Sequence, residues 1–262
     1  DTHINYEKHV DIASHFDFTF LAQKDYVEKM TDAGIKNVFW LPLACDPDIH
    51  GKVDHEKIWD VGFVGTIPET RNRRKTLLEK IGSRFNLSCE RKFMDEMAEH
   101  YSRSKIVFNN AINNDLNMRV FEALCSGSLL LTDGASGSGL EEMFENRKHL
   151  IIYEDENIES LIANYLENDM DRELIAEQGR YEVLKNHTYA HRAEDLINVL
   201  NSEIKEQSKE LSNTEKPENY YKNIRHDLIT LVPEDANCIL EVGCAEGMTG
   251  NELKKRPKVF VA

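Results

Sequence analysis

The 262-residue sequence lacks several features that mark particular classes of protein. No apolar run approaches the roughly 20 residues that a membrane-spanning helix needs, and no signal peptide precedes the first predicted helix. The five cysteines form no CxxC pair and no Cys/His spacing typical of a zinc site. We therefore expect reduced thiols, no metal site, no integral membrane segment and a cytoplasmic location.

Basic residues are also scarce relative to acidic ones. The sequence has 32 lysines and arginines against 47 aspartates and glutamates, a formal net charge of -15. Binding to nucleic acid is not expected, because a phosphate backbone requires concentrated positive charge. A local cluster of arginines can still hold a small anion.

The sequence mainly alternates apolar strands with amphipathic helices. Strands are predicted in DVGFVG, KIVFNNA, SLLLTD and HLIIYED, and helices lie between them. This alternation predicts an α/β fold, a Rossmann-like doubly wound parallel sheet with helices on both faces. The sequence begins at Asp1 and ends within a predicted strand, so we expect a piece of a longer polypeptide.

The helix predicted over residues 117–126 carries Arg119 and Glu122 near its start. One interpretation is a surface ion pair worth roughly 0.2 to 0.5 kcal/mol, but an arginine at a helix N-terminus opposes the helix dipole. A bound diphosphate would remove that conflict: Arg119 would contact the phosphates and Glu122 would accept hydrogen bonds from two ribose hydroxyls. The helix face predicted to pack on the sheet consists of Leu116, Val120, Ala123 and Leu124.

A second basic cluster follows the first strand of this series. The segment FVGTIPETRNRRK places Gly65 and Thr66 in a loop, then Arg71 and Arg74 near the start of a helix. Ligands of open parallel sheets bind outside the carboxyl ends of strands, so the two arginine-bearing loops can hold one phosphate group. The glycine-rich loop at residues 133–139 lies on the same edge. The alternative is a solvated basic helix start.

Several segments resemble a known family when taken in order. The segments DVGFVGT, RVFEALCSGSLLLTD, KHLIIYED and NHTYAHR resemble the C-terminal half of GT-B glycosyltransferases, with a glycosyl transferase group 1-like domain, and especially the spore-maturation-type bacterial group. The segments DFTFLAQKDYV and VFWLPLACDP resemble the end of the N-terminal half. The resemblance implies a partial N-terminal GT-B domain over residues 1–45, a nucleotide-sugar-binding domain over 46–195 and a helical linker over 196–219.

The same resemblance implies a hexosyltransferase-like enzyme. It would transfer a sugar from a nucleotide-diphosphate sugar donor to an unidentified carbohydrate, glycan or glycoprotein acceptor, without a metal ion. Glu122 matches the family's second paired glutamate, which holds the ribose, whereas Asn114 replaces the first glutamate, which contacts the donor sugar. Asn114 therefore leaves the sugar and the stereochemistry open. His3 is the candidate acceptor-activating base, and Asp46-Pro47-Asp48 is interpreted as a turn rather than a metal motif.

The segment ILEVGCAEGMTG resembles the first motif of class I S-adenosylmethionine-dependent methyltransferases. Glu241, Gly243, Ala245 and Gly247 occupy its glutamate and glycine positions, with Ala245 replacing the middle glycine. Residues 220–262 would be the truncated start of such a domain, and so short a segment cannot bury its sheet. We expect S-adenosylmethionine to bind only in a full-length protein.

Three hypotheses follow. The first is a bifunctional glycosyltransferase/methyltransferase. The second is an S-adenosylmethionine-dependent methyltransferase that carries a non-catalytic carbohydrate- or nucleotide-binding module. The third is a structural scaffold without a ligand.

Overall fold

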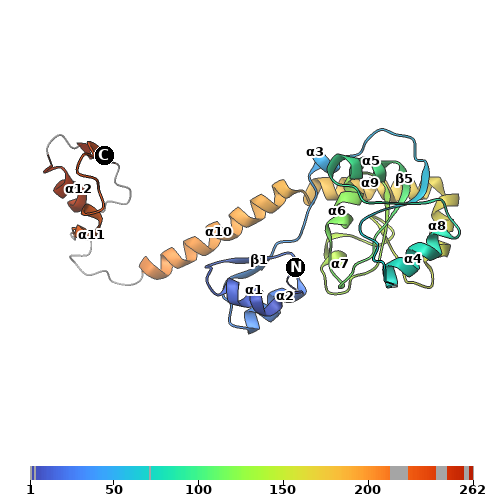
Figure 1. The fold of residues 1–262 in the computed structure, drawn as a ribbon, viewed down its shortest axis with the longest axis horizontal. Helices are drawn as coiled ribbons and strands as arrows, with labels where there is room; N and C mark the ends of the chain where they lie inside the picture. Colours follow the sequence, from blue (N-terminus) through green and yellow to red (C-terminus); the bar gives the residue numbers. More distant parts are fainter. Residues whose placement is uncertain are drawn as a thin grey trace. The chain divides into compact units, whose positions relative to one another are not determined.

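The computed structural model describes residues 2, 4–70, 72–212, 224–239, 247–256 and 260–261 (Figure 1). The chain divides into two compact units, residues 1–200 and 201–262. Among the helices of the described part, none combines the length and the apolar character needed to cross a bilayer.

The first unit begins with a small α/β segment. Strands β1 and β2 pair in parallel, and a small core lies between them and the neighbouring helices. The elements are α1 (Tyr6–Ala13), β1 (Thr19–Leu21), α2 (Asp25–Asp32), β2 (Val38–Trp40) and α3 (Pro47–His50). At α3 the Asp46 carboxylate accepts a hydrogen bond from the Asp48 N–H, so this aspartate caps a short helix.

The main sheet has five parallel strands in the order β4-β3-β5-β6-β7. Their bounds are β3 (Trp59–Val64), β4 (Leu87–Glu90), β5 (Ser104–Phe108), β6 (Leu129–Thr132) and β7 (Ile151–Ile152). Strand β4 lies on one side of β3 and β5 on the other, so the strand order reverses between β3 and β5. Open parallel sheets bind ligands in the crevice at such a reversal.

Helices cover both faces of this sheet, which confirms the predicted α/β fold (Figure 1). Helices α5 and α6 contribute to the core on one face, α4 and α8 to the core on the other, and α9 to both. Their bounds are α4 (Arg73–Gly82), α5 (Met94–Ser102), α6 (Met118–Cys125), α7 (Leu140–Met143), α8 (Ile158–Glu167) and α9 (Asp169–Asn186). All four residues predicted to pack α6 on the sheet are buried: Leu116, Val120, Ala123 and Leu124.

Backbone hydrogen bonds join the segment that follows β2 to the end of α9. The Cys45 N–H donates to the His187 carbonyl, and the Tyr189 N–H donates to the Cys45 carbonyl. Helix α10 (Tyr189–Ser212) begins at this junction.

The second unit contains a strand, a helix and a parallel strand. Strands β8 (Cys238–Ile239) and β9 (Phe260–Val261) pair in parallel, and α12 (Met248–Leu253) lies between them in sequence; α11 (His226–Ile229) precedes them. Gly247, directly before α12, has φ +72, a left-handed conformation that favours glycine. The motif positions Glu241, Gly243 and Ala245 lie outside the described residues.

Candidate functional site

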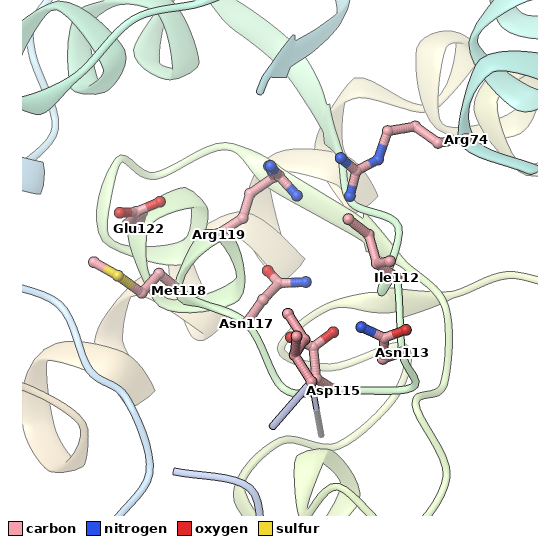
Figure 2. A pocket seen from close by; sticks show the side chains of 9 residues that line it. Arg74, Ile112, Asn113, Asp115, Asn117, Met118, Arg119 and Glu122 are labelled. Atoms are coloured by element: carbon pink, nitrogen blue, oxygen red, sulfur yellow. The ribbon is translucent and has the colours of Figure 1, made fainter. Parts of the chain in front are cut away.

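A cavity of about 370 Å³ lies beside the carboxyl ends of β3 and β5 (Figure 2). This is where the strand order reverses. Its lining comes from the start of α4, the segment after β5 and the first turns of α6, with one residue from the N-terminal segment: Ile4, Arg74, Ile112, Asn113, Asp115, Asn117, Met118, Arg119 and Glu122.

Arg119 extends from α6 to the ends of both central strands. Its Nε donates to the Val64 carbonyl at 3.0 Å, at the end of β3. Its Nη1 donates to Asn109 Oδ1 at 2.7 Å, directly after β5. The guanidinium also lies over the Phe63 ring, 4.8 Å from its centroid. Arg119 therefore bridges the two strands between which the order reverses, and it forms part of the cavity wall.

Gly65 is the residue that lets the β3 loop approach this guanidinium. A Cβ at position 65 would lie 2.7 Å from Arg119 Nη2 and 3.0 Å from Phe63 Cζ, closer than Cβ atoms normally come to their neighbours. The φ of +155 is also one that residues with a side chain rarely adopt. Glycine is thus required here both for space and for backbone conformation.

Arg74 approaches the cavity from α4. The residue is 7% exposed; its Nη1 donates to the Thr66 carbonyl at 3.1 Å and its Nη2 to the Asn110 carbonyl at 3.0 Å. Its Nε is buried and has no hydrogen-bond partner in the described part of the chain. Burial, and then the neighbouring Arg119, lower the pKa of Arg74. Figure 2 shows the two guanidinium groups pointing toward one another.

The charges of Arg74 and Arg119 are not neutralised by a direct carboxylate contact. Within the described ranges neither arginine takes part in an ion pair, and the hydrogen bonds of both go to neutral oxygens. Arg73, the sequence neighbour of Arg74, contrasts with them, since it contacts Asp133 at 2.6 Å and Asp155 at 2.7 Å. Burial and the charge of Arg119 lower the pKa of Arg74, and Asp115 and Asp133 act in the opposite direction without a direct ion pair. A bound anion would further favour the charged form of both arginines.

The start of α6 adds a further positive element to the same wall. Asn117 stands at the N-cap position, but its side chain caps none of the first N–H groups of the helix. The N-terminal turn therefore keeps amide donors, and the helix dipole favours negative charge there. Together with the two arginines, this turn suits a diphosphate.

Glu122 is a buried carboxylate one turn further along α6. It is 8% exposed; burial raises its pKa, while Arg119 acts in the opposite direction. His50 Nε2 lies 3.9 Å from Glu122 Oε1. The Asp46 N–H donates to His50 Nδ1 at 3.0 Å, so the proton of the neutral imidazole is on Nε2 and faces the carboxylate. A carboxylate here can accept hydrogen bonds from two hydroxyl groups.

The structure brings together most residues that the sequence singles out for donor binding. Arg74, Arg119 and Glu122 line the cavity. Gly65 contacts the Arg119 guanidinium, and the Thr66 carbonyl accepts from Arg74. These five residues come from two segments that are distant in sequence, one at residues 65–74 and one at residues 119–122.

Three other candidates are not placed at the cavity. Asn114 has a left-handed φ of +55, and its side-chain amide donates to the Ser136 carbonyl; the residue does not belong to the cavity lining. Arg71 and His3 lie outside the described residues.

Sequence reasoning missed four polar residues around the arginines. Asn109 and Asn110 follow β5 directly and accept from Arg119 and Arg74, through a side chain and a carbonyl respectively. Asp115 and Asn117 line the cavity just before α6. Two asparagines directly after a buried strand were the available signal, because the carboxyl ends of parallel strands share one edge of the sheet.

Residues 71–198 match a family of glycosyl transferase-like proteins. None of the curated protein sequences matches this chain. The fold is similar to that of Anabaena Alr3699/HepE in complex with UDP-glucose, with a TM-score of 0.59 and 12% identity over 77% of this chain and 68% of that one. Sucrose-phosphate synthase from Thermosynechococcus elongatus has a TM-score of 0.54 and 9% identity over 77% of this chain and 62% of that one. TarM of S. aureus has a TM-score of 0.54 and 13% identity over 75% and 46%.

The chain therefore spans about two thirds of the first two structures and less than half of TarM. The likeness shows the α/β fold with parallel sheets that GT-B glycosyltransferases have. The family match over residues 71–198 indicates a glycosyltransferase.

Proposed function

We propose that this chain carries the donor-binding half of a metal-independent glycosyltransferase that takes its sugar from a nucleoside-diphosphate sugar. The observation that carries this proposal is the pair of guanidinium groups, Arg74 and Arg119, held by neutral oxygens at the strand reversal. The complex of HepE with UDP-glucose supports a nucleotide sugar as the donor. The acceptor would be a carbohydrate, a glycan or a glycoprotein.

Each part of such a donor finds a matching group at the cavity. The diphosphate lies between Arg74 and Arg119 and faces the first turn of α6, where donors and positive charge are concentrated. The ribose hydroxyls donate to Glu122; burial raises the pKa of this carboxyl, and the neighbouring Arg119 opposes that shift and so favours the carboxylate as an acceptor. Arg71, which precedes α4 in the sequence and lies outside the described residues, would add a further cation.

The reaction breaks the bond between the anomeric carbon and a phosphate oxygen and forms a bond from that carbon to an acceptor hydroxyl oxygen. Negative charge grows on the departing diphosphate, and the two guanidinium groups stabilise it in a site that already holds them in place. The hydroxyl proton passes to a base, for which His3 is the candidate. The two arginines thus stabilise the charge that a divalent metal ion stabilises in other transferases. We therefore expect donor hydrolysis or transfer by the full-length enzyme to persist in EDTA. Loss of turnover in EDTA and its recovery with Mg²⁺ or Mn²⁺ would contradict metal independence.

The test of nucleotide binding uses titration calorimetry with UDP, GDP, dTDP and ADP. At least one nucleotide should bind the unsubstituted protein, and Arg119→Met and Arg74→Met should weaken it by about 10- to 150-fold, the range for a lost hydrogen bond to a charged group. Arg84→Met is the matched control, because the Arg84 side chain is 58% exposed and contacts Glu159 instead. Absence of binding to all four nucleotides, or equal losses in all three variants, would refute the proposal.

We further propose that the natural protein is bifunctional, of the spore-maturation type, with a methyltransferase domain that starts near residue 220. Residues 1–45 would end the N-terminal GT-B domain, 46–195 would form the donor-binding domain and 196–219 the linker. The parallel β8–α12–β9 unit and the left-handed Gly247 support a Rossmann-type start. S-adenosylmethionine should bind the full-length protein and not this chain; micromolar binding to this chain by calorimetry would contradict that division.

A cytoplasmic site of action belongs to the same proposal. Cys45, Cys89, Cys125 and Cys238 are free thiols, as in proteins of reducing compartments. The second hypothesis, a methyltransferase with a non-catalytic nucleotide-binding module, draws support from Asn114, whose side chain is directed to Ser136. Donor hydrolysis or transfer by the full-length protein separates it from the first.

A further inference from the structure

Two side chains of the cavity have oxygen atoms without a hydrogen-bond partner in the described part of the chain. Asp115 Oδ1 and Asn117 Oδ1 are both buried, and neither has a hydrogen-bond partner among the residues that the structure describes. Both residues line the cavity, while Leu116 between them is buried in the core of the sheet. Figure 2 shows both side chains on the same stretch of chain that leads into α6.

Folded proteins pair nearly all buried polar atoms, and among the unpaired atoms of the described residues these are the two oxygens that belong to cavity-lining side chains. An asparagine at an N-cap usually accepts a hydrogen bond from the second or third N–H of its helix, but Asn117 does not. Its amide is therefore not committed to the helix. The unpaired oxygens point to a ligand that brings its own hydrogen-bond donors.

The chemistry of the two groups decides which part of a nucleotide sugar they contact. An ionised carboxylate accepts hydrogen bonds and donates none, and the Asn117 oxygen is likewise an acceptor. The diphosphate has only acceptor oxygens, and the Asp115 carboxylate repels it. Sugar hydroxyls, in contrast, donate. The cavity thus offers acceptors suited to the sugar part of a donor as well as cations suited to its phosphate part.

Asn114 does not compete for this role. It adopts a left-handed backbone conformation, and its amide is engaged with the Ser136 carbonyl. The next residue, Asp115, instead presents a carboxylate to the cavity in which Arg74 and Arg119 lie.

Resting on the proposed function, we infer that Asp115 and Asn117 recognise hydroxyl groups of the transferred sugar, in place of Asn114. The donor sugar is then a neutral one with free ring hydroxyls near its diphosphate. The negative charge of Asp115 weakens the binding of the phosphates while its oxygens bind the sugar. The two residues therefore determine which sugar is bound, and they do not increase the affinity for the nucleotide.

The test compares UDP with UDP-glucose, UDP-galactose and UDP-N-acetylglucosamine by titration calorimetry on this chain. The measured quantity is the ratio of the affinity for the nucleotide sugar to the affinity for UDP. In Asp115→Asn we expect UDP to bind at least as tightly as before, because a nearby negative charge is lost, and the ratio for the preferred sugar to fall by about 10-fold or more. A damaged fold would weaken both ligands together and so gives a different result.

Asn117→Ser removes the amide oxygen and introduces a hydroxyl, which also suits the N-cap position. It provides the second variant and should also lower the ratio. Asp32→Asn, at the exposed end of α2, is the control and should leave both affinities unchanged. An unchanged ratio in both Asp115→Asn and Asn117→Ser for every sugar would overturn the inference and leave nucleotide binding intact. If the unsubstituted protein does not bind UDP, the same comparison with GDP and GDP-mannose and with dTDP and dTDP-glucose replaces it. Failure to bind any of them would refute the proposed function itself.

Discussion

Replacing Glu122 by glutamine should make the free protein more stable and the nucleotide complex weaker. Glu122 is 8% exposed, and burial raises the pKa of its carboxyl above the ordinary value. Burying the charged carboxylate therefore lowers the free energy of unfolding, and an amide of the same shape avoids this loss. Single stabilising substitutions commonly raise the free energy of unfolding by about 0.5 to 2 kcal/mol, and we expect Glu122→Gln to lie in this range. For a unit of this size, that corresponds to a rise in melting temperature of about 2 to 4 °C per kcal/mol.

The effect on binding has the opposite sign. Hydrogen bonds to a charged acceptor contribute about 1.5 to 3 kcal/mol, and bonds between neutral groups about 0.5 to 1.5 kcal/mol. Replacing the charged acceptor by a neutral one for two ribose hydroxyls then lowers the binding free energy by about 2 to 3 kcal/mol. Glu122→Gln should therefore bind UDP about 30- to 150-fold more weakly. Urea unfolding measures the first effect and titration calorimetry the second. Glu99→Gln is the control, because that carboxylate is 46% exposed and pairs with Arg103 at 2.9 Å.

The gain in stability also depends on pH with a definite sign. The pKa of Glu122 is higher in the folded protein than in the unfolded chain, so its contribution to stability is present at acid pH and is lost as pH rises through the folded pKa. The protonated carboxyl resembles the amide of Glu122→Gln, and the difference in stability between the two proteins should therefore shrink on acidification. A variant that is less stable at pH 8, or one that binds UDP as tightly as the unsubstituted protein, would refute this reasoning.

Two further predictions rest on other parts of the first unit. Gly65→Ala should weaken UDP binding by about 10-fold or more, because the added Cβ would displace the Arg119 guanidinium. Gly34→Ala is the control: Gly34 also has a positive φ, +90, but a Cβ there would meet open space. This control should lower stability without changing UDP affinity. Equal UDP affinities in the two variants would contradict the assigned position of Arg119. His187 has its pKa lowered to about 4, chiefly by burial, so it contributes stability above pH 6.5 that is lost as pH falls toward 4, up to about 3 kcal/mol. Urea unfolding between pH 7 and pH 4 measures this loss, and His187→Gln should flatten the profile; an unchanged profile would contradict the burial of a neutral imidazole.

The sequence by itself predicted four of the five strands of the main sheet, whereas the edge strand β4 and helix α5 were found only in the structure. The apolar run at residues 106–108 is typical of a central strand buried on both faces of a parallel sheet. The amphipathic spacing of residues 116–124 indicates a helix with one face toward the core. These patterns are local, so they are visible in the sequence. The same reasoning placed Arg119 and Glu122 at the start of a helix beside a strand end.

Only the tertiary structure decided which polar groups meet. The order of the strands is a long-range property, and it alone brings Val64 of β3 and Asn109 after β5 to the same guanidinium. Arg73 and Arg74 are chemically identical neighbours in the sequence, yet one is paired with two carboxylates and the other faces the cavity. Consecutive residues of a helix point about 100° apart, so the packing of α4 on the sheet determines which of the two faces the cavity without a carboxylate partner.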